Sequence, residues 1–382
     1  MSHYDVIVIG AGTWGGSVAW QLAERGQSVL AIDAFTPPHD RGSHAGATRL
    51  ARQSNSTGPE YVELTRQAFD DWDDVTARTG IEVMVKTGNV FVGRPGSKWF
   101  DNTLRNLKAS PFEYQIFTGE EAAARFPRVR IGADELAVWE PNAAVALVQP
   151  ALRALQRLGR EAGVHVRYDE PVLDWAATDS GVTVRTATGS YTAEHLVVTV
   201  GAFSNDVLRL DLPTRVERQV LANFSIDAGA DRLPSIYVAA PPGDDSAPAY
   251  GCAEPDGTFK FSVPGNGNTV APESLTQEVS ERDIERIVSI LRDRLPEIDG
   301  DPVATTVCMW TESEDGHWLL GRHPESERVI VGGGCNGRGF RYAPVIGAIL
   351  ADFVEGREHP ELQRFDVARY QSVATVTSRA PD

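Results

Sequence analysis

The sequence predicts a mixed α/β (α+β) protein in which a parallel βαβ unit at the amino terminus is joined to a second, mainly antiparallel region. Three observations lead to this fold class. Residues 4–33 read as a buried strand, a glycine-rich turn, a helix and a second buried strand. Alternating apolar and polar residues recur at 165–202 and 214–275. The order of strand, glycine turn and helix then returns at 329–355.

The first strand is expected at residues 4–9, a nearly continuous β-branched run of the kind found in parallel strands that are covered on both faces. Residues 14–26 carry apolar side chains at helical spacing and stop at Gly26, a residue that suits the left-handed conformation at a helix end. Residues 28–33 read as a second buried strand, which completes the βαβ unit.

The remaining elements follow from the same patterns. Residues 35–48 are too rich in Pro, Gly and Ser to form regular structure, and the loop is long enough to be functional. Strands are expected within 88–140, around a helical middle, and a mobile surface loop at 240–249. Helices are expected at 59–79, 147–162, 278–293 and 343–355.

Length and charge narrow the function classes. A chain of 382 residues exceeds the size at which one hydrophobic core usually keeps growing, so two domains are expected, with ample room to bury a cofactor. The formal net charge of -17 would repel phosphate backbones and anionic lipids. Nucleic acid and membrane surfaces are therefore excluded as expected partners.

The cysteines and the apolar runs point to a reducing compartment. Cys252, Cys308 and Cys335 are widely spaced and form neither a CxxC pair nor a zinc-type pattern, so neither a disulfide framework nor a metal site is expected. No apolar run approaches the roughly 18 to 20 residues that span a bilayer, and the first strand begins at Tyr4, which leaves no room for a signal peptide. A cytoplasmic protein is the resulting expectation.

The turn GAGTWG at 10–15 follows a buried strand directly and opens a helix. Its glycines allow a tight turn, close approach of the backbone to a pyrophosphate and close packing of the helix, whose amino end favours anions. Asp33 ends the second strand, where a carboxylate accepts hydrogen bonds from an adenosine ribose. The unit predicts a dinucleotide site and argues against NADP, but it does not distinguish FAD from NAD.

Motifs beyond this unit make the chain recognisable. GSHAGATRLAR lies at 42–52, TVCMW at 306–310 and GGGCNGRGFRY at 332–342. Together with the amino-terminal unit, they make the chain resemble the monomeric sarcosine oxidase and N-methyltryptophan oxidase family, FAD-dependent amine oxidoreductases of the D-amino-acid oxidase superfamily. Further matches over nearly the whole length are EYVELTRQAF at 60–69, EPNAAV at 140–145, VVTVGAFSNDVL at 197–208 and YGCAEPDGTFKF at 250–261.

The resemblance implies a discontinuous architecture and a reaction. An FAD-binding domain of the glutathione-reductase type would comprise residues 1–86, 146–214 and 318–382, and an interleaved catalytic domain would comprise 87–145 and 215–317. The implied reaction oxidises a secondary amine, an N-methyl or cyclic amino acid, to an imine while O2 is reduced to hydrogen peroxide. A monomer is expected.

The resemblance also implies which residues bind FAD. Cys308 matches a cysteine that forms a thioether to the flavin 8α carbon; the alternative is a buried free thiol, as expected for Cys252 and Cys335. The full cofactor-binding set is Gly10, Gly12, Thr13, Trp14, Gly15, Asp33, Ser43, His44, Thr48, Arg49, Val172, Cys308, Gly337, Gly339 and Arg341.

Lys260 is the expected catalytic cation. Phe259, Phe261 and Val263 share one face of a predicted strand, and Lys260 points to the other face. From the residues alone, a solvated lysine is the alternative. By resemblance Lys260 lies near the flavin, where a positive charge stabilises superoxide during O2 reduction.

Two arginines match cationic positions that hold the substrate carboxylate. They are Arg52 and Arg341, the latter in place of a lysine typical of the family, and a guanidinium fork suits a carboxylate well. In an Arg-rich chain the alternative for each is a surface charge. Arg49 matches a residue close to the flavin ring.

The pocket walls depart from the family pattern. Tyr250 and Trp310 match aromatic walls, Trp310 being larger than the usual tyrosine, with ordinary core packing as the alternative. Ala45 and Pro264 stand where the family has active-site histidines. These changes remove polar groups and favour a bulkier, less polar or cyclic amine over sarcosine.

Three other functions remain open at this point. The first is an FAD-dependent desaturase or dehydrogenase of a cyclic imino acid, acting in a specialised biosynthetic pathway with little use of O2. The second is a binding protein that retains the flavin fold without turnover, against which the presence of Lys260 and Cys308 argues. The third is an NAD-dependent enzyme.

Overall fold

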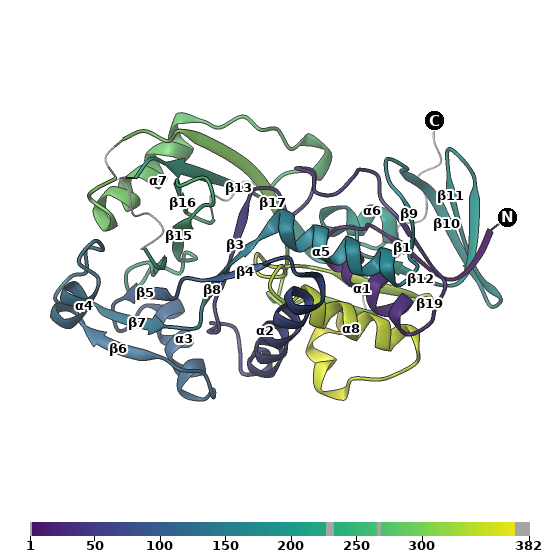
Figure 1. Ribbon diagram of the computed structural model, residues 1–382, viewed down its shortest axis with the longest axis horizontal. Helices are drawn as coiled ribbons and strands as arrows, with labels where there is room; N and C mark the ends of the chain where they lie inside the picture. The colour runs from purple at the N-terminus through teal and green to yellow at the C-terminus, as the bar shows by residue number, and fades with distance from the viewer. Residues whose placement is uncertain (1, 227–232, 266–268, 299, 371–382) are drawn as a thin grey trace.

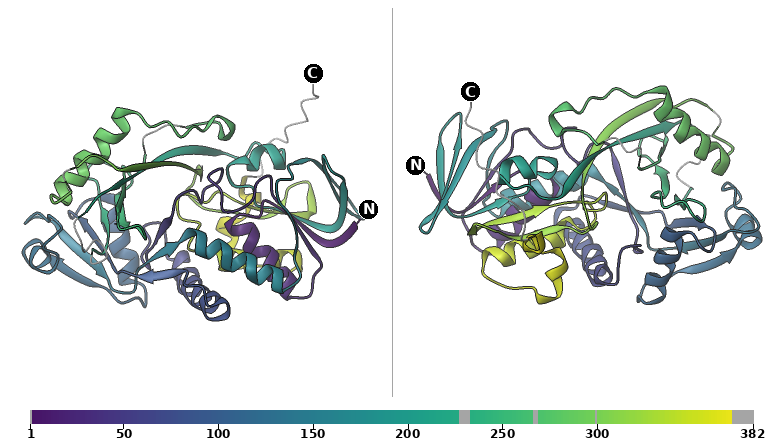
Figure 2. Two further views of the ribbon diagram at one scale, coloured as in Figure 1. Left: turned by 45° about the horizontal axis from the view of Figure 1, so that its top comes forward. Right: turned by 180° about the vertical axis from the view of Figure 1, so that it is seen from behind.

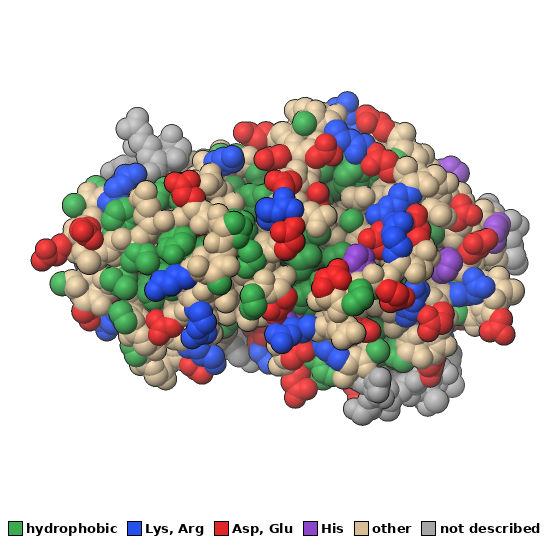
Figure 3. Space-filling model, turned by 90° about the horizontal axis from the view of Figure 1, so that it is seen from below, with side chains coloured by type: hydrophobic (Ala, Val, Ile, Leu, Met, Phe, Trp, Pro, Cys, Tyr) green, Lys and Arg blue, Asp and Glu red, His purple; other side chains and the backbone are tan. Residues whose placement is uncertain are grey.

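Two sheets of eight strands, joined by a three-stranded sheet, organise the computed structural model, which describes residues 2–226, 233–265, 269–298 and 300–370 (Figure 1). No helix in these ranges is long and apolar enough to cross a bilayer. Basic and acidic side chains are interspersed on the face of the molecule seen in Figure 3.

The first sheet has a parallel centre. Strands β9, β2, β1, β12 and β19 lie side by side in this order, each parallel to its neighbour. The hairpin of β10 and β11 extends β12 on one side, and β18 pairs with β19, both in antiparallel fashion. The bounds are β1 Ser2–Ile9, β2 Val29–Ile32, β9 His165–Arg167, β10 Val172–Thr178, β11 Gly181–Thr186, β12 Ser190–Val198, β18 Leu319–His323 and β19 Ser326–Gly333.

Strand β1 is buried on both faces, as its continuous apolar run predicts. Val6 and Val8 pack into the cluster formed with the helices, while Ile7 and Ile9 pack into the cluster on the opposite face. The helices of the first cluster are α1 Thr13–Glu24, α2 Glu60–Thr79, α5 Val148–Glu161 and α8 Ala343–Val354. Their arrangement against the sheet can be followed in Figure 2.

The second sheet is almost wholly antiparallel. Its order is β17-β13-β16-β15-β14-β5-β7-β6, with a single parallel contact between β14 and β5. One face of this sheet is apolar, and helix α7, Glu281–Arg294, packs there against Phe259 and Phe261. The strand bounds are β5 Asn89–Gly93, β6 Gln115–Thr118, β7 Leu136–Glu140, β13 Thr214–Phe224, β14 Ser235–Val238, β15 Ala249–Ala253, β16 Phe259–Ser262 and β17 Ala304–Ser313.

A small sheet lies between the two large ones in Figure 1. Its order is β3-β8-β4, with bounds Thr48–Ala51, Ala144–Leu147 and Met84–Lys86. The remaining elements are α3 Lys98–Lys108, α4 Gly119–Arg125 and α6 Ser204–Leu208, with 3-10 turns η1 Gly201–Phe203, η3 Pro272–Ser274, η4 Pro360–Phe365 and η5 Val367–Tyr370.

The mixed α/β fold class is confirmed, and the sheets agree with the predicted interleaving. Every strand of the first sheet falls within 1–86, 146–214 or 318–382. The strands of the second sheet come from 87–145 and 215–317, apart from Thr214 at the start of β13. The domain boundaries themselves stay a prediction, and residues 371–382 of the last segment lie outside the described residues.

Candidate active site

A cavity of about 960 Å³ runs between the two large sheets, near the upper end of the ~300 to 1,000 Å³ typical of ligand pockets. It extends from the glycine-rich turn after β1 to the faces of β16 and β17. All of the predicted site residues line it except Gly15. Segments far apart in the sequence therefore meet at one site.

The first glycine turn is shaped by close backbone contacts. Gly10 has φ +89°, and a Cβ there would lie 2.7 Å from the Thr199 carbonyl oxygen. A Cβ on Gly15 would lie 1.7 Å from the Gly10 carbonyl oxygen, so Gly15 brings α1 onto the strand rather than facing the cavity. Gly12 precedes α1, whose amino end has no side-chain cap. The first N–H groups of α1 are thus free to bind an anion.

Asp33 links the second strand to this turn. Its Oδ2 accepts from Ala11 N at 2.7 Å, and its Oδ1 accepts from Phe35 N at 2.9 Å. Burial raises the pKa of the Asp33 carboxyl, and these two hydrogen bonds partly oppose that rise. Each carboxylate oxygen can accept a second hydrogen bond, so the group can still bind a ribose.

The loop before β3 is held in place by Arg49. Its guanidinium donates to the carbonyl oxygens of Thr48 at 2.7 Å, Ser43 at 2.8 Å and Ala45 at 2.6 Å. Burial, together with neighbouring His39 and Arg49, lowers the pKa of His44 to about 3, so the imidazole is neutral at working pH. His44 Nε2 is buried and has no partner within the described ranges, which leaves it available for a cofactor hydrogen bond.

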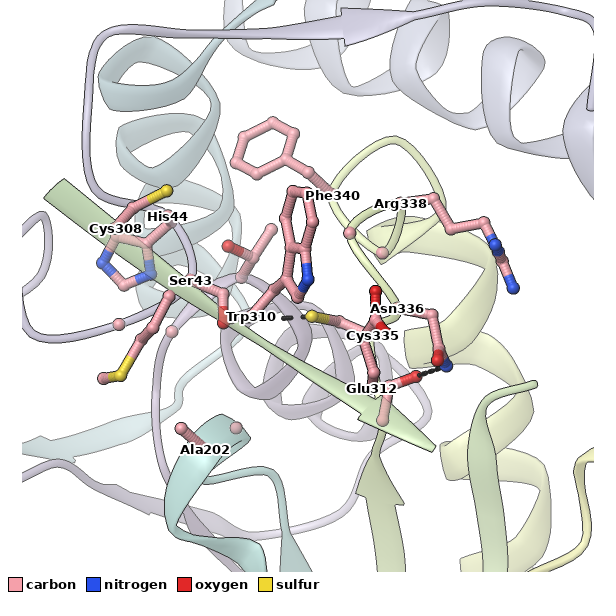
Figure 4. A pocket seen from close by; sticks show the side chains of 18 of the residues that line it. Ser43, His44, Ala202, Cys308, Trp310, Glu312, Cys335, Asn336, Arg338 and Phe340 are labelled. Carbon is pink, nitrogen blue, oxygen red and sulfur yellow. Dashed lines mark hydrogen bonds between the residues drawn. The ribbon is translucent and has the colours of Figure 1, made fainter. Parts of the chain in front are cut away.

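Strand β17 contributes a row of residues to the cavity. Cys308, Trp310 and Glu312 follow one another along one face of the strand in Figure 4, at the period of two, and Met309 also lines the cavity. The Cys308 side chain packs with Ala45, Leu221 and Tyr250, and the residue is 5% exposed. Burial raises the pKa of its thiol, while the positive charges of Arg49 and Lys260 act in the opposite direction.

The second glycine turn lies beside Trp310. Gly337 has φ +65°, and a Cβ there would lie 3.0 Å from the Trp310 ring. Trp14 Nε1 donates to the Gly339 carbonyl at 2.9 Å, which ties this turn to α1. Cys335 of the same turn lies 3.9 Å from the Ser43 hydroxyl, the contact drawn beside Trp310 in Figure 4. The two glycine turns thus form one continuous wall of the cavity.

Lys260 is buried and lines the cavity, so the alternative of a solvated lysine is wrong. Its predicted strand face is confirmed, because Phe259, Phe261 and Val263 pack into the core on the other side of the sheet. The Lys260 ammonium contacts Thr48 of β3 and forms an ion pair of 2.7 Å with Glu254, a residue the sequence did not single out.

The two predicted carboxylate-binding arginines have different surroundings. Arg52 lies 3.7 Å above the Tyr237 ring, and its buried Nη1 has no partner among the described residues. Arg341 donates from Nη1 to the Arg52 and Ser54 carbonyls and from Nη2 to the Tyr342 hydroxyl at 2.8 Å, so it fixes the backbone that carries Arg52. Its Nε has no partner in the part of the chain that the structure describes.

Sequence reasoning missed two other features of this region. Tyr237 stacks on Tyr250 with ring centroids 5.8 Å apart and supports Arg52. Glu140 is fully buried and accepts from the Ser54 amide and hydroxyl, each at 2.7 Å. The feature of the sequence that could have identified Glu140 is its position in the EPNAAV motif.

The donor set fits FAD. A glycine cradle at a helix amino end suits a pyrophosphate, and Asp33 suits a ribose. Buried polar atoms without partners remain along the rest of the cavity: His44 Nε2, Arg52 Nη1, Trp310 Nε1 and Arg341 Nε. Such atoms are costly unless a ligand or water satisfies them.

Comparisons with known proteins identify the family of the chain. Residues 5–353 match the family model described as FAD dependent oxidoreductase. Monomeric sarcosine oxidase of Streptomyces avermitilis is 31% identical, over 91% of this chain and 93% of that protein. N-methyl-L-tryptophan oxidase of Salmonella agona is 29% identical, over 96% and 99%. The open form of NikD, an unusual amino acid oxidase essential for nikkomycin biosynthesis, superposes with a TM-score of 0.85 at 25% identity, over 96% and 98%.

Proposed function

Because the chain belongs to the FAD-dependent oxidoreductase family, we propose that it oxidises the C–N bond of a secondary amino acid to an imine and passes the electrons to O2. The substrate class is an N-methyl or cyclic amino acid. The observation that carries the proposal is the convergence of Lys260, Arg52 and Arg341 on the cavity that also holds the glycine cradle.

Each residue has a role in this proposal. Bound FAD would supply the acceptor for a hydride from the carbon next to the amine. Arg52, with its free Nη1, and Arg341, with its free Nε, orient the substrate carboxylate. Tyr237, Tyr250 and Trp310 exclude water around the amine. The Lys260 ammonium stabilises the charge that develops on O2.

The supporting relatives are oxidases of N-methyl amino acids by name, so the alternative of a desaturase or dehydrogenase is not favoured. A less polar amine than sarcosine is supported by Ala45 and Pro264, two apolar residues of this region. The expected monomeric state and the cytoplasmic location stay predictions.

Peroxide release tests the proposal. N-methyl and cyclic amino acids should produce hydrogen peroxide in air, one per amine oxidised, as measured by a coupled peroxidase assay. The matched control for each substrate is the amine that lacks only the carboxylate, which should react far more slowly because Arg52 and Arg341 then have no anion to orient. No peroxide from any member of such a panel would refute the oxidase proposal.

We also propose that Cys308 carries the flavin through a thioether to its 8α carbon, a bond that would replace the S–H of the thiol and one C–H of the methyl group, with the two electrons passing to O2. The support is its place in the cavity wall, on the same strand face as Trp310, where the charges of Arg49 and Lys260 partly oppose the burial that raises the pKa of the thiol. Cys252 is an unsuitable alternative because it is not among the residues that line the cavity. Its Sγ instead lies 3.4 Å from the Thr48 hydroxyl.

Acid precipitation checks the link. The unmodified protein should give a yellow pellet, and Cys308→Ala should release the colour into the supernatant because the only covalent tether is lost. Cys335→Ala is the matched control: its thiol also lines the cavity but lies on the glycine turn, and its pellet should stay yellow. A yellow supernatant from the unmodified protein would contradict the link.

A further inference from the structure

The Lys260 ammonium has all of its hydrogen-bonding capacity in use. It donates to the Thr48 carbonyl at 2.9 Å and to the Thr48 hydroxyl, and it meets Glu254 Oε1 at 2.7 Å. An ammonium has three N–H groups, so these three acceptors satisfy it. Lys260 therefore presents a positive charge to the cavity, while its three N–H groups are already used within the protein.

Glu254 is an unusual partner because it is hidden from both solvent and cavity. The side chains of Lys260 and Glu254 are 4% and 2% exposed, and Glu254 is not among the residues that line the cavity. Oε1 also accepts from the Thr48 hydroxyl at 2.5 Å, whereas Oε2 has no partner among the residues that the structure describes. Within the described ranges, Lys260 is the only ion-pair partner of Glu254.

The hairpin between β15 and β16 brings the two residues together. Glu254 directly follows β15, and its backbone pairs with Thr258 at the start of the return strand. Cys252 and Lys260 are opposite each other in the β15–β16 register, and Glu254 lies two residues beyond Cys252 on the same face, from where it reaches back to the lysine. Burial raises the pKa of the Cys252 thiol and keeps it neutral, which leaves Glu254 as the nearby negative charge.

The physical consequence is electrostatic. Two opposite charges in a poorly solvated site interact far more strongly than in water, and each weakens the field of the other at a third point. A buried ion pair is also often no more stabilising than an apolar replacement of similar size, so stability alone gives little account of this one. Arg49 has no such counter-ion within the described residues and keeps its full charge.

We propose that Glu254 is a positioning residue that holds the Lys260 ammonium against Thr48 and sets how much positive charge Lys260 presents to the bound flavin. The proposal rests on the proposed function only for the presence of flavin beside Lys260. With Glu254 ionised, the pair has no net charge, but its ammonium end lines the cavity and the carboxylate does not, so part of the lysine charge acts on the flavin. Without the Glu254 charge, the lysine acts as a full cation.

The midpoint potential of the bound flavin tests this role. Glu254→Gln keeps the size and the hydrogen-bond acceptor but removes the negative charge, so the potential should shift in the positive direction, because an uncompensated cation favours the reduced, anionic cofactor. An anaerobic reductive titration measures the shift without any amine, so a wrong substrate assignment would not alter the result. An unchanged or lower potential would overturn the proposal.

A matched control separates charge from stability. Glu135 is also buried and forms an ion pair of 2.6 Å with Arg294, away from the cavity. Glu135→Gln should lower the melting temperature and leave the potential unchanged. A positive shift in Glu135→Gln equal to that in Glu254→Gln would overturn the assignment to Glu254.

A second pair of variants covers the case in which Glu254→Gln does not retain flavin. Lys260→Met leaves the Glu254 carboxylate unpaired, while Lys260→Met with Glu254→Gln removes both charges. The single variant should have the lower potential of the two, because only it keeps the negative charge near the flavin. Equal potentials in these two proteins would overturn the proposal.

Discussion

Gly15→Ala is expected to yield a protein that purifies with little or no FAD. The new Cβ would lie 1.7 Å from the Gly10 carbonyl oxygen and 2.6 Å from the Thr199 hydroxyl. Both neighbours belong to the buried end of the first sheet, where Thr199 Oγ1 donates to the Gly10 carbonyl at 2.8 Å. Helix α1 must therefore move away from the strand, and the phosphate cradle opens with it. Overpacking of this kind costs roughly 1 to 3 kcal/mol, or about fivefold to more than hundredfold in affinity.

Gly16→Ala is the matched control for that prediction. It lies on the same helix, but the nearest atom to its added Cβ is the Ala11 carbonyl oxygen at 3.7 Å, an ordinary contact. The ratio of flavin absorbance to protein absorbance after purification measures both variants. Gly16→Ala should keep a full complement of FAD; equal flavin content in the two variants would show that the cradle does not bind the cofactor as proposed.

Removal of the Lys260 charge should slow reoxidation of the reduced enzyme by O2 about 100-fold to 1,000-fold, the usual effect of losing one preorganised group that stabilises developing negative charge. Because Lys260→Met alone would leave a buried carboxylate unpaired, the variant of choice is Lys260→Met with Glu254→Gln. Reduction by the amine should change much less, since Arg52 and Arg341 are untouched.

Stopped-flow absorbance separates the two half-reactions. The anaerobic enzyme is first reduced with substrate and then mixed with O2, and the return of the flavin absorbance gives the reoxidation rate. Lys108→Met, which removes an exposed lysine on α3, is the control and should behave as the unmodified protein. Unchanged reoxidation in the double variant would remove Lys260 from the proposed chemistry.

The cofactor cradle could be predicted because its signals are local in sequence. The continuous apolar run of β1, the glycines at 10, 12 and 15 and the carboxylate of Asp33 each constrain residues only a short distance apart. The structure brings Asp33 to this turn, where its carboxylate accepts a hydrogen bond from Ala11 N. The alternation along β16 likewise predicted the face of Lys260.

The environment of Lys260 could not be predicted in the same way. Glu254 lies in a Pro-Asp-Gly turn that would ordinarily be solvated, and it is buried only because β3 brings in Thr48 from 206 residues earlier in the chain. Arg341 was expected to hold a carboxylate, yet most of its donors bind carbonyl oxygens of residues 52–54 and a tyrosine hydroxyl. Such long-range partners leave no periodic or compositional pattern.

The three-stranded sheet could not be predicted from local sequence either. Residues 48–51 directly follow a loop rich in Gly and Ser, and they form β3 only by pairing with β8, nearly a hundred positions later. This pairing sets Thr48, Arg49 and Arg52 beside the cavity. The family resemblance placed these residues at the site, whereas their strand conformation depends on a tertiary contact.

A flavin bound in this cavity is proposed to take electrons directly from a secondary amino acid. The decisive measurement is the absorption spectrum of the purified protein under anaerobic conditions, before and after an N-methyl or cyclic amino acid is added. We expect an oxidised flavin spectrum that bleaches with the amino acid and returns when air is admitted. A yellow protein whose spectrum no such amino acid bleaches, or a colourless protein, would contradict it.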